Sequence, residues 1–159
     1  MNYRSHLMSM CCHVQLSINA FSATMPNPYL ITFSKLGTPE IGYISVIEQQ
    51  QLVPFDIQRI FWTYYTPESI VRGRHAHYVT EQVLIAAAGR ITVLTELADG
   101  TMQTFRLDEP NVGLYVPPHA WHTMQYSHSA VQLVLSSIPY NAADYIRDYD
   151  VFKRVWQAK

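Results

Sequence analysis

The stretch ITVLTELADGTMQTFRL, residues 91–107, contains the strongest short-range fold signal in this chain. Two runs rich in β-branched and aromatic residues flank Asp99-Gly100, a dipeptide that favours a tight turn between antiparallel strands. We therefore expect residues 91–97 and 101–107 to pair as a β-hairpin.

Runs of the same kind continue on both sides of this hairpin, separated by turn signals and without a convincing interior helix. The expected strands are Tyr29–Phe33, Gly42–Ile47, Ile57–Tyr65, Gln82–Ala87, Ile91–Leu97, Thr101–Leu107, Gly113–Val116, His122–Tyr126 and Val131–Ser136. Strands at this spacing predict an all-β barrel or a two-sheet jelly roll, which limits free strand edges by closure or by sheet packing. Only residues 142–155 indicate helical turns.

The length and composition predict one compact domain. A chain of 159 residues is too short for two ordinary domains, and 48% hydrophobic against 14% charged residues excludes disorder as a description of the whole chain. So much apolar surface favours a homo-oligomer, and we expect a homodimer. Residues 1–27 lack strand-like alternation and end at Pro26-Asn27-Pro28, so we expect an N-terminal extension over 1–27 and the domain over 28–159.

The charge pattern excludes several kinds of partner. The formal net charge is −1 and the eleven Lys and Arg residues are scattered, so we expect no nucleic-acid partner. No run approaches the roughly 18 apolar residues of a spanning helix, which favours a cytoplasmic protein without a membrane partner. Cys11 and Cys12 are adjacent, so a framework of disulfides is excluded and we expect both cysteines to be reduced.

A pair of histidines in RGRHAH, residues 72–77, is the strongest candidate for chemistry. In a strand, residues two apart face the same side, so His75 and His77 are expected to point together into the barrel. By the same alternation, Arg72 and Arg74 are expected on the opposite face if no bulge interrupts the strand. Imidazoles with pKa values near neutrality suit general acid–base chemistry, although two chance histidines on an exposed strand are the simpler alternative.

A second cluster lies in GLYVPPHAWH, residues 113–122. The two clusters together resemble the two conserved segments of the cupin family, His-x-His-x3-Glu and then Gly, Pro and His. Such a set of side chains suits Fe, Mn, Ni or Zn, so a metal-dependent dioxygenase or isomerase remains open. In that case the metal ligands would be His75, His77, Glu81 and His122.

A wider resemblance extends from about residue 29 to residue 153. Five strings in order resemble signatures of the bacterial dTDP-4-keto-6-deoxyhexose 3,4-ketoisomerases. They are PFDIQR (54–59), RGRHAH (72–77), GLYVP (113–117), WHTM (121–124) and DYIRDYDVF (144–152). The resemblance implies a cupin (RmlC-like) jelly-roll β-barrel with a short C-terminal helical tail.

The same resemblance implies an isomerase that needs neither metal nor cofactor. It would move the keto group of a dTDP-linked 6-deoxyhexose between C4 and C3 through an enediol, for amino-sugar synthesis and surface polysaccharide. A cupin that only binds a sugar, without catalysis, is the third alternative. Titration with a dTDP-sugar and metal analysis would separate the three.

Within this interpretation, His75 and His77 are the catalytic candidates, and His77 is the preferred group for removing the C3 proton. Arg72 and Arg74 are candidates for binding the diphosphate or the enediolate, because a guanidinium offers a fork of donors. Glu81 is a candidate to orient a histidine. The remaining candidate substrate contacts are Gln82, Trp121, His122 and Tyr64, the last because Phe61-Trp62 stand where the family commonly has tyrosines.

Overall fold

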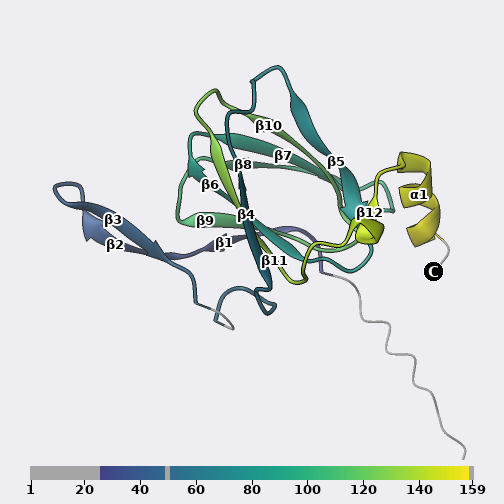
Figure 1. The fold of residues 1–159 in the computed structure, drawn as a ribbon, viewed down its shortest axis with the longest axis horizontal. Helices are drawn as coiled ribbons and strands as arrows, with labels where there is room; N and C mark the ends of the chain where they lie inside the picture. Colours follow the sequence, from purple (N-terminus) through teal and green to yellow (C-terminus); the bar gives the residue numbers. More distant parts are fainter. Residues whose placement is uncertain (1–25, 49–50, 158–159) are drawn as a thin grey trace, which may run out of the picture.

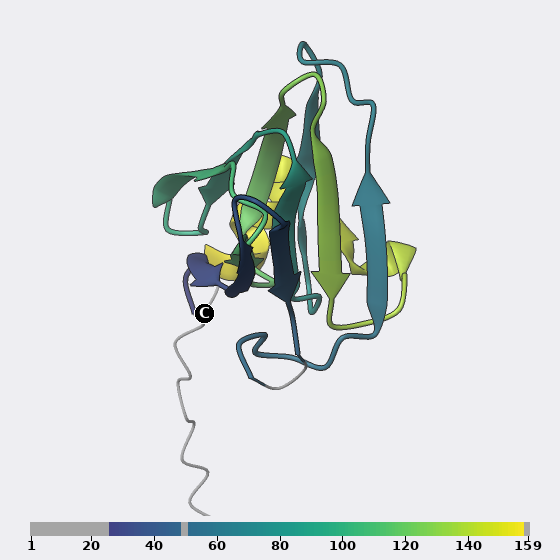
Figure 2. The same ribbon diagram turned by 90° about the vertical axis from the view of Figure 1, so that its left-hand side faces the viewer.

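Two antiparallel sheets face each other and form a jelly-roll barrel (Figures 1 and 2). The structure is a computed structural model that describes residues 26–48 and 51–157. In chain order the elements are β1 (Tyr29–Thr32), β2 (Ser34–Thr38), β3 (Gly42–Val46), β4 (Arg59–Thr63), β5 (Val71–His77), β6 (Gln82–Ala88), β7 (Ile91–Glu96), β8 (Met102–Leu107), β9 (Val112–Val116), β10 (Trp121–Tyr126), β11 (Val131–Ser136), the 3-10 helix η1 (Ala142–Asp144), β12 (Tyr145–Ile146) and α1 (Tyr149–Gln157). The predicted all-β class with a short C-terminal helix is confirmed.

The two five-stranded sheets divide the strands between them. One has the order β1-β9-β6-β11-β4 and the other β12-β5-β10-β7-β8. The hairpin predicted around Asp99-Gly100 is confirmed, because β7 pairs with β8 from Ile91 opposite Leu107 to Glu96 opposite Met102. Strands β2, β5 and β12 were not among the nine expected strands, although the orientation expected for His75 and His77 treated their residues as part of a strand.

The main core lies between the sheets and is built from the inward side chains of both. Its fully buried members include Leu84, Ile91, Leu107 and Leu114. A second cluster packs on the outer face of β6 and β9, where the loop containing Val53 and Phe55 covers the sheet. Strand β6 is therefore buried on both faces up to Ala86, which explains the apolar run that follows Gln82.

The β2–β3 hairpin projects from the barrel, on the side opposite to α1 (Figure 1). Every residue of both strands is exposed. A two-stranded ribbon is at best marginally stable in water by itself, so this ribbon needs a surface to pack against.

The C-terminal segment returns to the barrel. Strand β12 pairs with the end of β5, with Tyr145 opposite His77, and the fully buried side chain of Phe152 anchors α1. The carboxylate of Glu96 accepts hydrogen bonds of 2.6 Å from both Tyr149 Oη and Lys153 Nζ. Within the described ranges, no helix is long and apolar enough to cross a membrane.

Candidate active site

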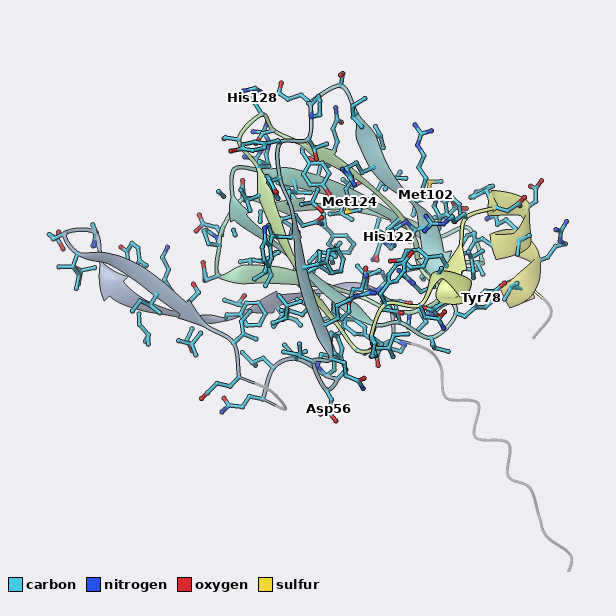
Figure 3. All side chains as sticks on the ribbon, in the orientation of Figure 1. Asp56, Tyr78, Met102, His122, Met124 and His128 are labelled. Carbon is cyan, nitrogen blue, oxygen red and sulfur yellow. The ribbon has the colours of Figure 1, made fainter. Side chains whose placement is uncertain are left out.

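Three histidines from two neighbouring strands come together inside the barrel. The ring centroid of His75 lies 5.0 Å from that of His77 and 4.5 Å from that of His122. His75 and His77 come from β5, whereas His122 comes from β10 and points into the barrel interior (Figure 3). The sequence therefore predicted correctly that the two histidines of β5 lie together.

A cavity of about 250 Å³ opens beside this cluster. His75, His122 and Gln82 line it together with Arg72, Tyr145 and Arg147. Phe61, Leu84 and Val134 form an apolar part of the wall. His77 is not among the lining residues: it is only 2% exposed and lies next to His75 and Tyr145.

A β-bulge in β5 decides which arginine reaches the cavity. The register with β10 passes from His75 opposite His122 directly to Gly73 opposite Thr123, so Arg74 is an extra residue. Gly73 and Arg74 both have positive φ, +84° and +56°. The prediction that Arg72 faces away from His75 is therefore wrong, because the bulge interrupts the alternation and returns Arg72 to the side of His75. Arg74 is exposed and does not line the cavity.

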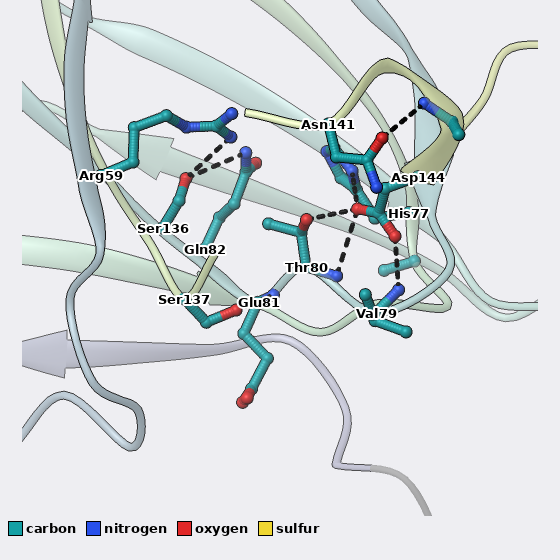
Figure 4. A network of polar contacts seen from close by, with 12 residues as sticks. Arg59, His77, Val79, Thr80, Glu81, Gln82, Ser136, Ser137, Asn141 and Asp144 are labelled. Carbon is teal, nitrogen blue, oxygen red and sulfur yellow. Dashed lines mark hydrogen bonds and ion pairs between the residues drawn. The ribbon is translucent and has the colours of Figure 1, made fainter. Parts of the chain in front are cut away.

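His77 is held by a carboxylate from the C-terminal segment. Its Nδ1 lies 2.9 Å from Oδ2 of Asp144, and both side chains are buried. Asp144 also accepts hydrogen bonds from the backbone of Val79 (2.8 Å) and Thr80 (3.3 Å) and from the Thr80 hydroxyl (Figure 4). Burial and the neighbouring His75 lower the pKa of His77 to about 4, against the opposing influence of Asp144.

The other two histidines are also held neutral. Burial, followed by the neighbouring imidazoles, lowers the pKa of His122 well below its usual range. Burial also lowers the pKa of His75, with a smaller contribution from the positive charge of Arg147. All three rings are therefore neutral at pH 7 and can accept protons.

Tyr145 and Arg147 complete the site, although the sequence predicted a role for neither of them. The Tyr145 ring lies 4.4 Å from the His77 ring, and the Arg147 guanidinium lies 4.4 Å over the Tyr145 ring. With Asp144 they form one short stretch that borders the histidines. The only sequence signal was the string DYIRDYDVF, which matched the ketoisomerase signatures as a whole without indicating individual roles.

Several predicted site residues lie elsewhere. Glu81 accepts a 2.6 Å hydrogen bond from Tyr115 and points away from Asp144 (Figure 4), so the residue that orients a histidine is Asp144 instead. Trp121 packs its ring against Tyr149 and Phe152 of α1. Tyr64 lines a separate hollow of about 680 Å³ between residues 64–69 and 128–131.

Gln82 lies in the cavity wall as predicted, and its amide nitrogen is 3.5 Å from Ser136 Oγ. The same hydroxyl accepts a 3.3 Å hydrogen bond from Arg59 (Figure 4). In the part of the chain that the structure describes, no group of three or more His, Cys, Asp or Glu side chains is placed to hold a metal ion. Cys11 and Cys12 lie outside that part.

Comparison with known proteins identifies a matching family and several similar proteins. The family model described as "FdtA: WxcM-like, C-terminal" matches residues 26–157. The chain is 41% identical over 127 residues to TDP-4-oxo-6-deoxy-alpha-D-glucose-3,4-oxoisomerase of Aneurinibacillus thermoaerophilus. The aligned residues cover 79% of this chain and 89% of that protein.

Two solved structures agree with this match. The sugar 3,4-ketoisomerase QdtA of Thermoanaerobacterium thermosaccharolyticum, in complex with TDP, superposes with a TM-score of 0.79 at 33% identity over 83% of this chain and 96% of that one. The TDP-quinovose 3,4-ketoisomerase WlaRB of Campylobacter jejuni gives a TM-score of 0.76 at 33% identity over 80% and 98%. The resemblance inferred from the sequence strings is thus confirmed, and the chain belongs to the sugar 3,4-ketoisomerase family within the cupin fold.

Proposed function

We propose that this protein moves the keto group of a dTDP-linked 4-keto-6-deoxyhexose from C4 to C3 through an enediol. The observation that carries the proposal is a cavity bordered by neutral imidazoles and by the guanidinium groups of Arg72 and Arg147. Proton acceptors beside cations are what an enediol reaction requires, because a proton leaves carbon while negative charge develops on oxygen. The relatives named above act on TDP-linked sugars of this class.

The reaction needs two proton transfers at carbon and two at oxygen. A base removes the proton from C3 while the carbonyl oxygen at C4 receives a proton, which gives the enediol. The hydroxyl at C3 then loses its proton and C4 gains one, so that the carbonyl is at C3. No atom is gained or lost, and no oxidant is required.

His75 and His77 are the acid–base pair in this proposal. His75 lines the cavity, so we assign to it a direct contact with the substrate. His77 lies beside His75 and is almost fully buried. The preference for His77 as the group that removes the C3 proton therefore stays a prediction. His122 and Gln82 are the wall contacts for the sugar.

Arg72 and Arg147 are the cations that we assign to the diphosphate or to the developing enediolate. The predicted substrate contacts of Arg74, Trp121 and Tyr64 stay predictions, and their side chains lie outside the histidine cavity. The cytoplasmic location and the lack of a nucleic-acid partner also stay predictions.

We further propose a homodimer in which the β2–β3 hairpin packs on a second copy of the chain. Leu36 lies opposite Ile44, and Val46 follows on the same side of the ribbon. These three side chains are 57%, 66% and 38% exposed, whereas the other side carries Lys35 and Tyr43. An apolar face on a ribbon that is marginal by itself is typical of a contact between subunits.

Isotope exchange and two histidine variants test the reaction. In deuterium oxide, we expect the product to carry deuterium at C4, because the proton returned to carbon comes from a group that exchanges with solvent. We expect His75→Asn and His77→Asn each to lower kcat by roughly 10²- to 10⁴-fold, the usual contribution of general acid–base catalysis. The control is His128→Asn, whose exposed side chain lies far from His122 (Figure 3) and should leave kcat unchanged.

Other outcomes would favour the alternatives. Loss of activity on chelation, restored by a divalent ion, would indicate a metal-dependent enzyme. Tight binding of a dTDP-sugar without any 3-keto product would indicate a protein that only binds the sugar. Full activity of both histidine variants would contradict the acid–base assignment.

A further inference from the structure

The Asp144 carboxylate accepts hydrogen bonds from donors of Val79 and Thr80. It lies 67 residues from His77 in the chain and is 4% exposed. The backbone N–H groups of Val79 and Thr80 and the hydroxyl of Thr80 all donate to it, as Figure 4 shows. These contacts favour the ionised carboxylate, because a protonated acid at this position would direct its own hydrogen against a donor.

An ionised Asp144 determines which nitrogen of His77 carries the proton. Nδ1 of His77 lies 2.9 Å from Oδ2 of Asp144, so Nδ1 must donate. A neutral imidazole has a single N–H, and Nε2 is then left with a free lone pair on the side of the ring away from Asp144. Nε2 is buried and has no hydrogen-bond partner among the described residues.

We propose that Asp144 is a positioning residue that holds His77 in the tautomer with hydrogen on Nδ1, so that Nε2 is available to accept a proton during the reaction. The catalytic part of this inference rests on the proposed function, whereas the tautomer does not. The Asp144 carboxylate also fixes the ring plane of His77, which lies 5.0 Å from the His75 ring and 4.4 Å from the Tyr145 ring. The arrangement resembles in chemistry the carboxylate that orients the histidine of a hydrolase triad.

The substitution Asp144→Asn tests the tautomer directly. The asparagine amide would donate to Nδ1 of His77, so the ring proton should move to Nε2. We would measure this by ¹⁵N NMR of histidine-labelled protein at pH 7, with the His77 signals assigned from their absence in His77→Asn. If His77 kept its hydrogen on Nδ1 in Asp144→Asn, the proposal would be overturned.

The variant Thr80→Val separates positioning from simple structural support. It removes one donor to the same carboxylate at a buried site but leaves the contact between Asp144 and His77 intact. We expect Asp144→Asn to lower kcat by at least about 10²-fold, the lower part of the range for general acid–base catalysis, while Thr80→Val stays within a few-fold of the native enzyme. KM should change little in both variants, because the Asp144 side chain is not among the residues that line the cavity.

Equal losses of kcat in the two variants, or a changed tautomer without loss of kcat, would overturn the proposal. Melting temperatures measured alongside show how much stability each variant has lost. If the native protein formed no 3-keto product, the proposed function would fail. The tautomer change is measured without substrate and would still support the role of Asp144 in orienting His77.

Discussion

Gly73 allows the close approach of β5 to β10 that shapes the site. Its φ of +84° lies in the region that favours glycine, and a Cβ added there would lie 2.6 Å from the carbonyl oxygen of His122 and 3.2 Å from Cα of Thr123. The bulge at Gly73 and Arg74 therefore brings β5 so close to β10 that only glycine fits. This close approach places Arg72, His75 and His122 around the same cavity.

We predict that Gly73→Ala destabilises the protein by at least about 1–2 kcal/mol, the cost of a left-handed conformation for a residue with a Cβ. The backbone of β5 must also shift away from His122, so kcat should fall even where the variant is fully folded. Gly100→Ala is a suitable control, because Gly100 has a similar φ of +88° and nothing within 4 Å of an added Cβ. Urea unfolding and kinetics of both variants check this; equal kcat values would argue against the bulge as a determinant of the site.

At the scale of residues, the sequence predicted the histidines and Gln82 but indicated no role for Asp144, Tyr145 or Arg147. The alternation of a strand places His75 and His77 together wherever β5 runs, since no irregularity separates them. The position of Arg72 depends on a bulge that the alternation rule does not include. Asp144 depends on a contact across 67 residues, and such contacts are determined by the complete fold rather than by local pattern.

The C-terminal segment is the element that links the fold to the chemistry. Strand β12 is only two residues long, yet its pairing with β5 places Asp144, Tyr145 and Arg147 at the histidines. No periodic pattern can reveal a two-residue strand. The helix that follows was expected, and its contacts through Phe152 and Glu96 keep the segment in place.

We predict that Phe152→Ala releases this segment before the barrel unfolds. Truncation of a buried phenylalanine typically costs about 3–5 kcal/mol, and here the loss is concentrated where α1 packs on the barrel. Hydrogen exchange should accelerate first over residues 145–153, and kcat should fall at temperatures where the barrel remains folded.

Leu107→Ala provides the matched comparison for Phe152→Ala. Leu107 is fully buried in the main core at the end of β8, so its truncation costs about 2–5 kcal/mol without touching the C-terminal segment. We expect Leu107→Ala to keep its kcat below its own melting temperature. If the two variants lost activity in parallel with global stability, the segment would have no separate role.

At the scale of the whole molecule, the exposed ribbon of β2 and β3 predicts that two copies of the chain form a dimer. Sedimentation at micromolar concentration should return a species of twice the 18.3 kDa mass of the chain. The double substitution of Leu36 and Ile44 by serine should shift the protein toward the single-chain mass, because it removes the apolar side of the ribbon. Tyr43→Ser on the other side is the control, and dissociation by that variant alone would contradict the proposed contact face.

The barrel as a whole was predictable because its signals are local and repeated. Alternating apolar residues and turn dipeptides define most of the strands, and closure of the sheets follows from the need to bury their apolar faces. The ribbon of β2 and β3 was only half predicted, since Ser34–Thr38 contains Lys35 and Gly37 and lacks a strand-like pattern.

The late position of the β12 segment also has a consequence during protein synthesis. Ribosomes deliver a chain from its N-terminus, and β1 to β11 all precede residue 137, whereas Asp144, Tyr145 and Arg147 follow. The strands of the barrel are therefore synthesised before the segment that completes the site. Until this segment pairs with β5, His77 has neither its carboxylate partner nor the neighbouring Tyr145 ring, so the complete site forms only when the last strand has been added to the barrel.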